Sequence, residues 1–200
     1  MIIIPKNYVS PYGIMDTERA IKLIKDTFET TLAGALQLTR ISAPLFVKRA
    51  TGLNDDLNGV ERPVSFEMKD AEGQTIEIIH SLAKWKRLAL KRYGISLHEG
   101  IYTDMNAIRR DEELDNTHSI YVDQWDWEKV IAPTDRTLAY LQQTVNQLYN
   151  AFLETEAALV AHYPKCRAFL PKEVTFISSQ ELEDRYPTLS AQKREEVFAK

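Results

Sequence analysis

The segment from residue 101 to residue 128 constrains the fold most, because it encodes two β-strands on either side of a short charged loop. Residues 101–109, IYTDMNAIR, and residues 119–128, SIYVDQWDWE, alternate with the period of two that a strand requires. The intervening RDEELDNTH is shorter than the crossover that joins parallel strands. The sequence therefore predicts an antiparallel hairpin.

The second strand of this hairpin, within HSIYVDQWDWEKV at residues 118–130, has two unlike faces. One face begins apolar and then carries an amide and two carboxylates; it consists of Ile120, Val122, Gln124, Asp126 and Glu128. The other face is mainly aromatic and consists of Tyr121, Asp123, Trp125 and Trp127. Periodicity alone leaves two interpretations open: the polar face is either the solvated side of an ordinary hairpin or the floor of a binding site.

Several elements precede this hairpin. We expect an amphipathic helix at 16–36 with Asp16 or Thr17 as N-cap, a strand at 36–46 with Pro44 near its end, a loop at 51–59, a hairpin of 64–68 with 75–80, and a helix at 81–94 with Ser81 as N-cap and Gly94 just past its end.

Further helices follow the hairpin. We expect a long helix at 134–162 ended by Pro164, with an apolar stripe of Leu138, Leu141, Val145, Leu148, Phe152 and Leu159, then a strand at 174–178, a helix opened by a Ser178–Glu181 capping box, and a last helix at 194–200. Hairpins and charged loops join the strands in place of regular βαβ units. The predicted fold class is therefore α+β, an antiparallel sheet flanked by helices, in a single domain at 1–200.

The overall composition favours a cytoplasmic protein that binds neither nucleic acid nor membrane. The net charge is −4 with both signs interspersed, which gives no electrostatic argument for a polyanionic partner. The single cysteine, Cys166, excludes an internal disulfide and suits a reducing compartment. No apolar run is long enough to cross a bilayer, and the one at the N-terminus is too short for a signal peptide.

Familiar catalytic signatures are missing from the sequence. There is no GxxxxGK[ST] and no GxGxxG, and no pair of His or Cys has the spacing of zinc ligands, so no metal site is predicted within the chain. The four histidines are scattered, and each taken alone favours a structural or exposed role: His80, His98, His118 and His162. Cys166 has no recognisable base partner, which favours an unreactive thiol.

Two stretches nevertheless resemble class II aminoacyl-tRNA synthetases. The order strand–Arg109–x–Asp111–loop–strand is similar to their motif 2, most closely to that of the aspartyl and asparaginyl enzymes. HSLAKWKR, residues 80–87, is similar to the segment of aspartyl synthetases whose lysine binds a carboxylate of the amino acid. The helix at 16–36 and the strand after it look like motif 1. The resemblance implies a class II synthetase-like catalytic domain and a homodimer formed through residues 16–46.

The resemblance is closer still to the aspartate–ammonia ligases, the ammonia-dependent asparagine synthetases. It rests on HSLAKWKR, EGIYT, AIRRDE, HSIYVDQWDWE and SQELEDRYP in this order, and it runs from about Glu18 to Lys200. Members of that family are longer. The resemblance therefore implies an N-terminal portion that stops before a glycine-rich motif 3, with Mg²⁺ ligands expected beyond Lys200 and no activity expected from this portion alone.

The resemblance also implies a reaction and residue roles. L-Aspartate, ammonia and ATP would give L-asparagine, AMP and pyrophosphate through β-aspartyl-AMP. The catalytic residues would be Arg109, facing the α-phosphate, and Lys86, facing a substrate carboxylate. The implied nucleotide-binding residues are Arg109, Asp111 and Val122, and the implied aspartate-binding residues are Asp55, Ser81, Lys86, Gln124 and Asp126. Trp125 and Trp127 would pack on helices behind the strand, and the loop 51–59 would be a lid.

Two alternatives remain open. One is an aspartyl- or asparaginyl-tRNA synthetase paralogue, which would need a tRNA-binding domain that neither the length nor the charge of this chain provides. The other is a non-catalytic interaction module that keeps the synthetase-like fold.

Overall fold

The computed structural model describes residues 2–55, 57 and 59–199, so positions 56 and 58 of the predicted loop 51–59, and Lys200 of the predicted last helix, lie outside the described residues. The chain divides into two compact units, Met1–Ala168 and Phe169–Lys200. A single domain at 1–200 stays a prediction. None of the helices in the described ranges combines the length and the apolarity that a bilayer span requires.

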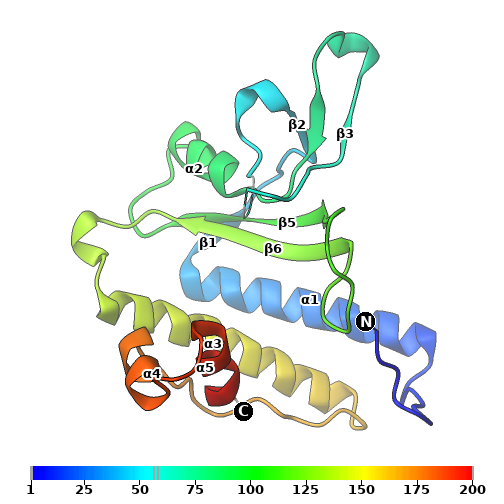
Figure 1. The fold of residues 1–200 in the computed structure, drawn as a ribbon, viewed down its shortest axis with the longest axis vertical. Helices are drawn as coiled ribbons and strands as arrows, with labels where there is room; N and C mark the ends of the chain where they lie inside the picture. Colours follow the sequence, from blue (N-terminus) through cyan, green and yellow to red (C-terminus); the bar gives the residue numbers. More distant parts are fainter. Residues whose placement is uncertain (1, 56, 58, 200) are drawn as a thin grey trace. The chain divides into compact units, whose positions relative to one another are not determined.

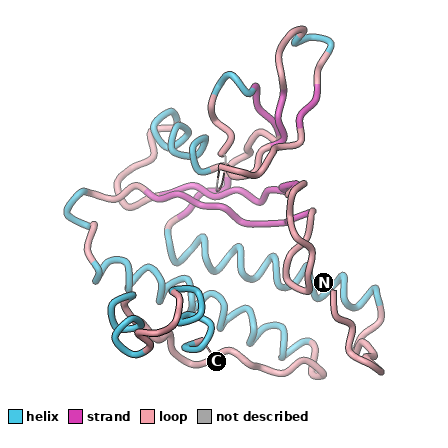
Figure 2. The backbone as a smooth tube through the Cα atoms, in the orientation of Figure 1, coloured by secondary structure: helices cyan, strands magenta, loops and turns pink. Residues whose placement is uncertain are grey.

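The first unit is built on the predicted hairpin (Figures 1 and 2). Strands β5 (Gly100–Ile108) and β6 (Tyr121–Lys129) are antiparallel, in register from Gly100 opposite Lys129 to Ile108 opposite Tyr121. Strand β1 (Leu38–Arg40) adds to β5 in a parallel orientation. The hairpin and the α+β class are confirmed.

The strand predicted at 36–46 is wrong in its extent, because its residues are divided between two sheets. After β1, the Ile41 N–H donates to Tyr102 O at 3.0 Å, and pairing then stops. Pro44 lies in the break and has no N–H to offer a neighbouring strand. Strand β2 (Phe46–Lys48) begins after it and pairs with β4 (Ile76–Ile78) in the second sheet.

The second sheet confirms the hairpin predicted between 64–68 and 75–80. Strand β3 (Ser65–Phe66) is antiparallel to β4, which lies between β2 and β3. Short 3-10 turns at Arg49–Thr51 and Lys69–Ala71 adjoin these strands, and a third lies at Pro133–Asp135.

Helices cover both faces of the first sheet (Figure 1). α1 (Ile14–Leu36) and α3 (Leu138–His162) lie on one face, where Trp125 and Trp127 pack against the cluster of Phe28, Leu32, Leu36, Leu38, Tyr102 and Ala151. α2 (Ala83–Arg92) lies on the other face, where Leu82 packs with Ile79, Met105 and Ala107. The predicted placement of the two tryptophans on helices is confirmed.

The helices were predictable, but the starts of α1 and α2 were not. α1 is capped by Gly13 and not by Asp16 or Thr17, so the helix begins before either of them. α2 is capped by Leu82, although Ser81 Oγ accepts a hydrogen bond from the Ala83 N–H at 3.3 Å. Gly94 is in the left-handed region just past α2, as predicted.

α3 begins at Leu138, four residues later than predicted, because Thr137 is its N-cap and Pro133–Asp135 forms a separate 3-10 turn. Its buried residues are Ala151 and Thr155, whereas Leu138 and Leu141 of the predicted stripe are 68% and 58% exposed. Small residues on this face allow α3 to pack beside α1.

The second unit contains α4 (Ser179–Arg185) and α5 (Ala191–Phe198). Ser178 and Glu181 form the predicted capping box at the start of α4. Arg194 fastens the two helices by donating to Tyr186 O at 3.1 Å and to Glu183 Oε1 at 3.1 Å. The strand predicted at 174–178 is wrong: these residues have no regular secondary structure and belong to neither sheet of the described residues.

Candidate functional site

A buried ion pair joins α2 to the polar face of β6. Lys86, one turn into α2, has no exposed side-chain surface, and its Nζ pairs with Asp126 Oδ1. Asp126 Oδ2 accepts a hydrogen bond from the Leu82 N–H at 3.3 Å, at the start of the same helix. The structure therefore brings together three predicted site residues, Ser81, Lys86 and Asp126, where α2 meets the sheet.

Burial acts on the charges of this pair. Loss of hydration lowers the pKa of Lys86, while the carboxylates of Asp126 and Glu128 oppose that shift. Burial raises the pKa of Glu128, against the opposing charges of Lys86 and Arg87. Glu128 was not among the predicted site residues. The period of two placed it on the face of Asp126, which was the signal that could have identified it.

The rest of this face is only partly polar. Gln124 Nε2 lies 3.3 Å from Met105 Sδ, and Val122 packs on the apolar cluster beneath α2. Thr103 is opposite Asp126 in the register, and its buried hydroxyl has no hydrogen-bond partner among the described residues. The polar face that the sequence predicted on β6 thus exists, with α2 and Lys86 packed against it, while its role as the floor of a binding site stays a prediction.

Asp55 is positioned by its neighbour Asn54, which is buried. The Asn54 side chain donates to Glu77 Oε2 at 3.2 Å and to Ile78 O at 3.3 Å. Its Oδ1 accepts from the His80 N–H at 2.9 Å and from the Asp55 N–H at 3.1 Å. Asn54 therefore fixes the start of the predicted lid to the segment that leads into α2. No pattern in the sequence distinguishes Asn54.

Arg109 and Asp111 lie where β5 ends. The Arg109 N–H donates to Ile120 O at 2.7 Å and closes the strand pair. A cavity of about 60 Å³ opens beside it, lined by Leu57, Glu61, His80, Arg109, Arg110, Asp111 and Glu112. His80 and the Nε atom of Arg109 are buried there, and no group in the described ranges forms a hydrogen bond to Arg109 Nε or to the His80 imidazole.

Asp111 is held by an arginine that the sequence did not single out. Arg62 donates to Asp111 from its backbone N–H at 2.9 Å, from Nε at 3.0 Å and from Nη2 at 2.6 Å. The hydrogen bonds from the Arg62 side chain, and then from its backbone N–H, hold the pKa of the Asp111 carboxyl well below its usual range. A bidentate clamp of this kind orients the carboxylate but occupies both of its oxygens.

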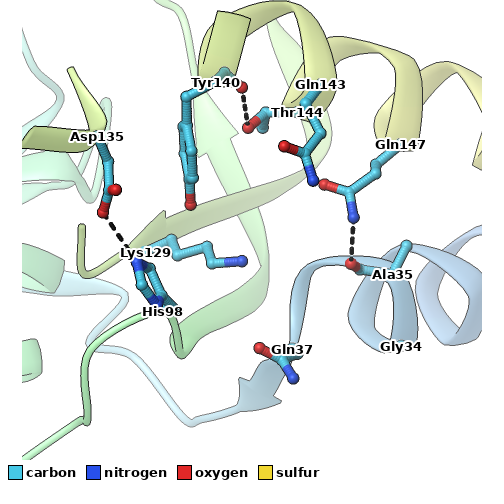
Figure 3. Close-up of a pocket in the computed structure, with 10 residues that line it drawn as sticks. All are labelled: Gly34, Ala35, Gln37, His98, Lys129, Asp135, Tyr140, Gln143, Thr144 and Gln147. Carbon is cyan, nitrogen blue, oxygen red and sulfur yellow. Dashed lines mark hydrogen bonds and ion pairs between the residues drawn. The ribbon is translucent and has the colours of Figure 1, made fainter. Parts of the chain in front are cut away.

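A larger polar cavity, of about 500 Å³, lies on the side of the sheet that α1 and α3 cover (Figure 3). His98 Nε2 lies 2.8 Å from Asp135 Oδ2, and Gln147 Nε2 donates to Ala35 O at 3.1 Å. Lys129 points into the space between these side chains. A neighbouring, more apolar cavity of about 520 Å³ includes Leu138 and Leu141. Neither contains Lys86 or Arg109, so cavity size does not mark the predicted site.

The described residues offer no evident site for a metal ion. Within them, no three His, Cys, Asp or Glu side chains gather as metal ligands would. These residues therefore do not fit a magnesium site.

Comparison with known proteins gave one family and many relatives. Residues 15–200 match the family model described as "Aspartate-ammonia ligase". The chain is 57% identical over 199 residues to an aspartate–ammonia ligase of Lactobacillus johnsonii, 58% to one of Clostridium perfringens and 56% to one of Limosilactobacillus fermentum. Each alignment covers 100% of this chain and 59% of the relative. The chain thus spans about three-fifths of the length of these curated relatives.

Among solved structures, a pyrrolysyl tRNA synthetase of Desulfitobacterium hafniense is similar, with a TM-score of 0.45 and 12% identity. The match covers 70% of this chain and 51% of that one.

Proposed function

The chain belongs to the aspartate–ammonia ligase family, and on that premise we propose that the protein joins ammonia to the β-carboxylate of L-aspartate at the expense of ATP. The products are L-asparagine, AMP and pyrophosphate, and the intermediate is β-aspartyl-AMP. The buried pair of Lys86 and Asp126 carries this proposal, because it places one positive and one negative group where a molecule with two carboxylates and one ammonium can exchange partners with both.

Aspartate binding is then an exchange of ion pairs. A substrate carboxylate replaces Asp126 on Lys86, and the substrate ammonium replaces Lys86 on Asp126. Neither protein charge is left without a counter-ion at any stage, which matters because an unpaired charge in a buried site is costly. Gln124, on the same face as Asp126, supplies an amide to the same substrate, and Asp55 and Ser81 complete its surroundings.

In the first step, a β-carboxylate oxygen of aspartate attacks the α-phosphorus of ATP, and the bond from that phosphorus to pyrophosphate breaks. Negative charge grows on the α-phosphoryl oxygens, and we assign its stabilisation to the Arg109 guanidinium. Asp111 and Val122 lie on the same hairpin and bind the nucleoside. Since Arg62 occupies both Asp111 oxygens, an adenine amino group that uses Asp111 must share the carboxylate with Arg62 or displace it.

In the second step, ammonia attacks the activated β-carbonyl carbon, the bond to AMP breaks, and the nitrogen loses one proton. Water must be kept from the same carbon. We assign that role to the loop 51–59, whose start Asn54 anchors. Mg²⁺ bound to the triphosphate would supply charge neutralisation, and the described residues contain no group of ligands that would hold it.

The oligomeric state, the cellular location and the partners of the protein are proposed as well. We propose a homodimer formed through residues 16–46, which include the 45% exposed Ile21 on α1, and a cytoplasmic location, which suits the lone Cys166. The net charge of −4 supports the absence of nucleic acid among its partners.

Aspartate-dependent exchange of labelled pyrophosphate into ATP tests the first step without ammonium. Adding ammonium should then give asparagine and AMP in equal amounts. Asp126→Ala should lose the exchange. Pyrophosphate exchange that does not depend on aspartate would contradict the proposal. Transfer of the activated aspartate to added tRNA and not to ammonia would contradict it as well.

A further inference from the structure

The side chain of His80 is buried, but it forms no hydrogen bond with the described residues. It is 1% exposed, between the end of β4 and the start of α2, and its backbone N–H donates to Asn54 Oδ1 at 2.9 Å. Neither ring nitrogen has a hydrogen-bond partner in the described part of the chain. Burying such a polar group without a partner is costly, so its retention calls for an explanation such as a ligand that supplies the partner.

Arg109, which lines the same cavity, has a second group of the same kind. Its Nε atom is buried and has no hydrogen-bond partner among the described residues. A cavity of about 60 Å³ is lined by both His80 and Arg109. A space of this size is far too small for a nucleotide, and only a small group such as one phosphoryl could enter it.

We propose that His80 is a binding residue for the α-phosphoryl group, which it holds together with Arg109. This inference rests on the proposed function and extends it to a residue outside the predicted site. A neutral imidazole always carries one N–H, whichever tautomer it adopts, and can donate that proton to a phosphoryl oxygen. It does so without adding a second buried charge beside Arg109.

The charged residues around the cavity bear on where an anionic ligand would lie. Asp111 is already paired with Arg62, and Arg110, which also lines the cavity, donates to Pro63 O at 3.3 Å. The Nε atom of Arg109 has no hydrogen-bond partner among the described residues. Glu61 and Glu112 also line the cavity, and as carboxylates they disfavour an anion next to them. The phosphoryl group is therefore expected between His80 and Arg109.

The test compares AMP with adenosine, which lacks the phosphate. Affinities of the protein for AMP, adenosine and L-aspartate are measured by calorimetry for wild type, His80→Leu and His80→Gln. Gln keeps an N–H near the position of the ring Nε2, whereas Leu fills space without a donor. His162→Leu, on α3, is the matched control. In parallel, the ring ¹⁵N resonances of the four histidines are recorded in wild type while either ligand is added.

We expect His80→Leu to weaken AMP binding about 10- to 100-fold, the effect of losing one hydrogen bond to a charged group. Adenosine and aspartate binding should not change, and His80→Gln should recover part of the AMP affinity. The His80 resonances should shift with AMP and not with adenosine. If His80→Leu does not fold, His80→Gln and the wild-type resonances decide the question.

Two results would overturn the inference alone: unchanged AMP affinity in His80→Leu, or equal weakening of AMP and adenosine, which indicates a packing role. A different result separates the two proposals. If wild type binds neither AMP nor adenosine, the proposed function fails and this inference fails with it.

Discussion

Lys86 is the largest of the fully buried side chains in the described part of the molecule. Burial lowers the pKa of Lys86, and the nearby carboxylates of Asp126 and Glu128 oppose that shift. Asp126 preserves the charged form, and the Leu82 N–H in turn holds Asp126. The ammonium is therefore available to a substrate carboxylate only as part of this arrangement.

Lys86→Met should lose aspartate-dependent pyrophosphate exchange and also lower the free energy of unfolding by roughly 3–5 kcal/mol. The second effect follows because Asp126 is left as a partly buried carboxylate without its cation. Denaturant unfolding and the exchange assay measure the two losses separately. The double variant Lys86→Met with Asp126→Leu should regain stability and remain inactive. A single variant with normal exchange would rule out Lys86 as a substrate ligand.

Glu128 should make stability depend on pH. Its folded pKa lies above the ordinary value of 4.5, so between those two values the folded state binds more protons than the unfolded state. The stability of wild type must therefore fall as the pH rises through that window. Glu128→Gln has no proton to lose there. Its unfolding free energy relative to wild type should rise from pH 4.5 upward and then level off, and a difference that stays flat would contradict the assignment.

The site could be predicted from the sequence only in part. The face of β6 that carries Gln124 and Asp126 followed from period-two alternation, which is a local property. The roles of Lys86 and Arg109 came from the resemblance of short motifs and remain predictions. The contact between Arg62 and Asp111 left no trace in the sequence, because it joins positions 49 residues apart through a loop of irregular structure.

At the scale of secondary structure, local sequence patterns predicted an element correctly when its pairing partner was close in the chain. The β5–β6 hairpin needs only its own alternation and its loop. The division of residues 36–46 between β1 and β2 depends on two different partner strands, β5 and β4, and neither is visible from the segment itself. Helix starts were missed for a related reason: Gly13 and Leu82 cap α1 and α2 without a side-chain hydrogen bond that a sequence pattern could reveal.

Gly100 lies where the neighbouring strands β1 and β6 approach β5 closely. A Cβ atom there would lie 2.5 Å from Glu128 O, 2.6 Å from Leu38 Cδ2 and 3.0 Å from Lys129 Cα. Gly100→Ala should therefore force β1 or β6 to move and lower the free energy of unfolding by about 1–3 kcal/mol. Thermal or denaturant unfolding measures this change.

Gly34→Ala is the matched control for that substitution. Gly34 lies inside α1 with nothing within 4 Å of an added Cβ, so alanine should stabilise the helix by about 0.5–1 kcal/mol. Equal effects of the two substitutions would show that the contacts at Gly100 do not restrict the sheet.

For the whole molecule, the family match identifies the relatives of the chain, and the structure shows which parts of a site its described residues contain. The match over residues 15–200 establishes the family, and the chain spans 59% of its curated relatives. The described residues contain the ion pair of Lys86 and Asp126, to which we assign the amino acid, and the cavity beside Arg109, but no group of metal ligands. The amino-acid side of the proposed reaction is therefore the part that these residues explain most fully.

The proposed homodimer makes a testable prediction about the assembly of the whole molecule. Ile21 is 45% exposed on α1, where its apolar side chain gains from burial against a second copy of the chain. Ile21→Lys would place a charge in that contact, so the protein should sediment as a folded monomer while wild type sediments as a dimer. Leu97→Lys is the control, since Leu97 is 53% exposed and lies outside residues 16–46. Sedimentation velocity over a range of concentrations, with circular dichroism to verify folding, distinguishes the cases. A wild type that stays monomeric, or an Ile21→Lys variant that dimerises as wild type does, would remove α1 from the interface.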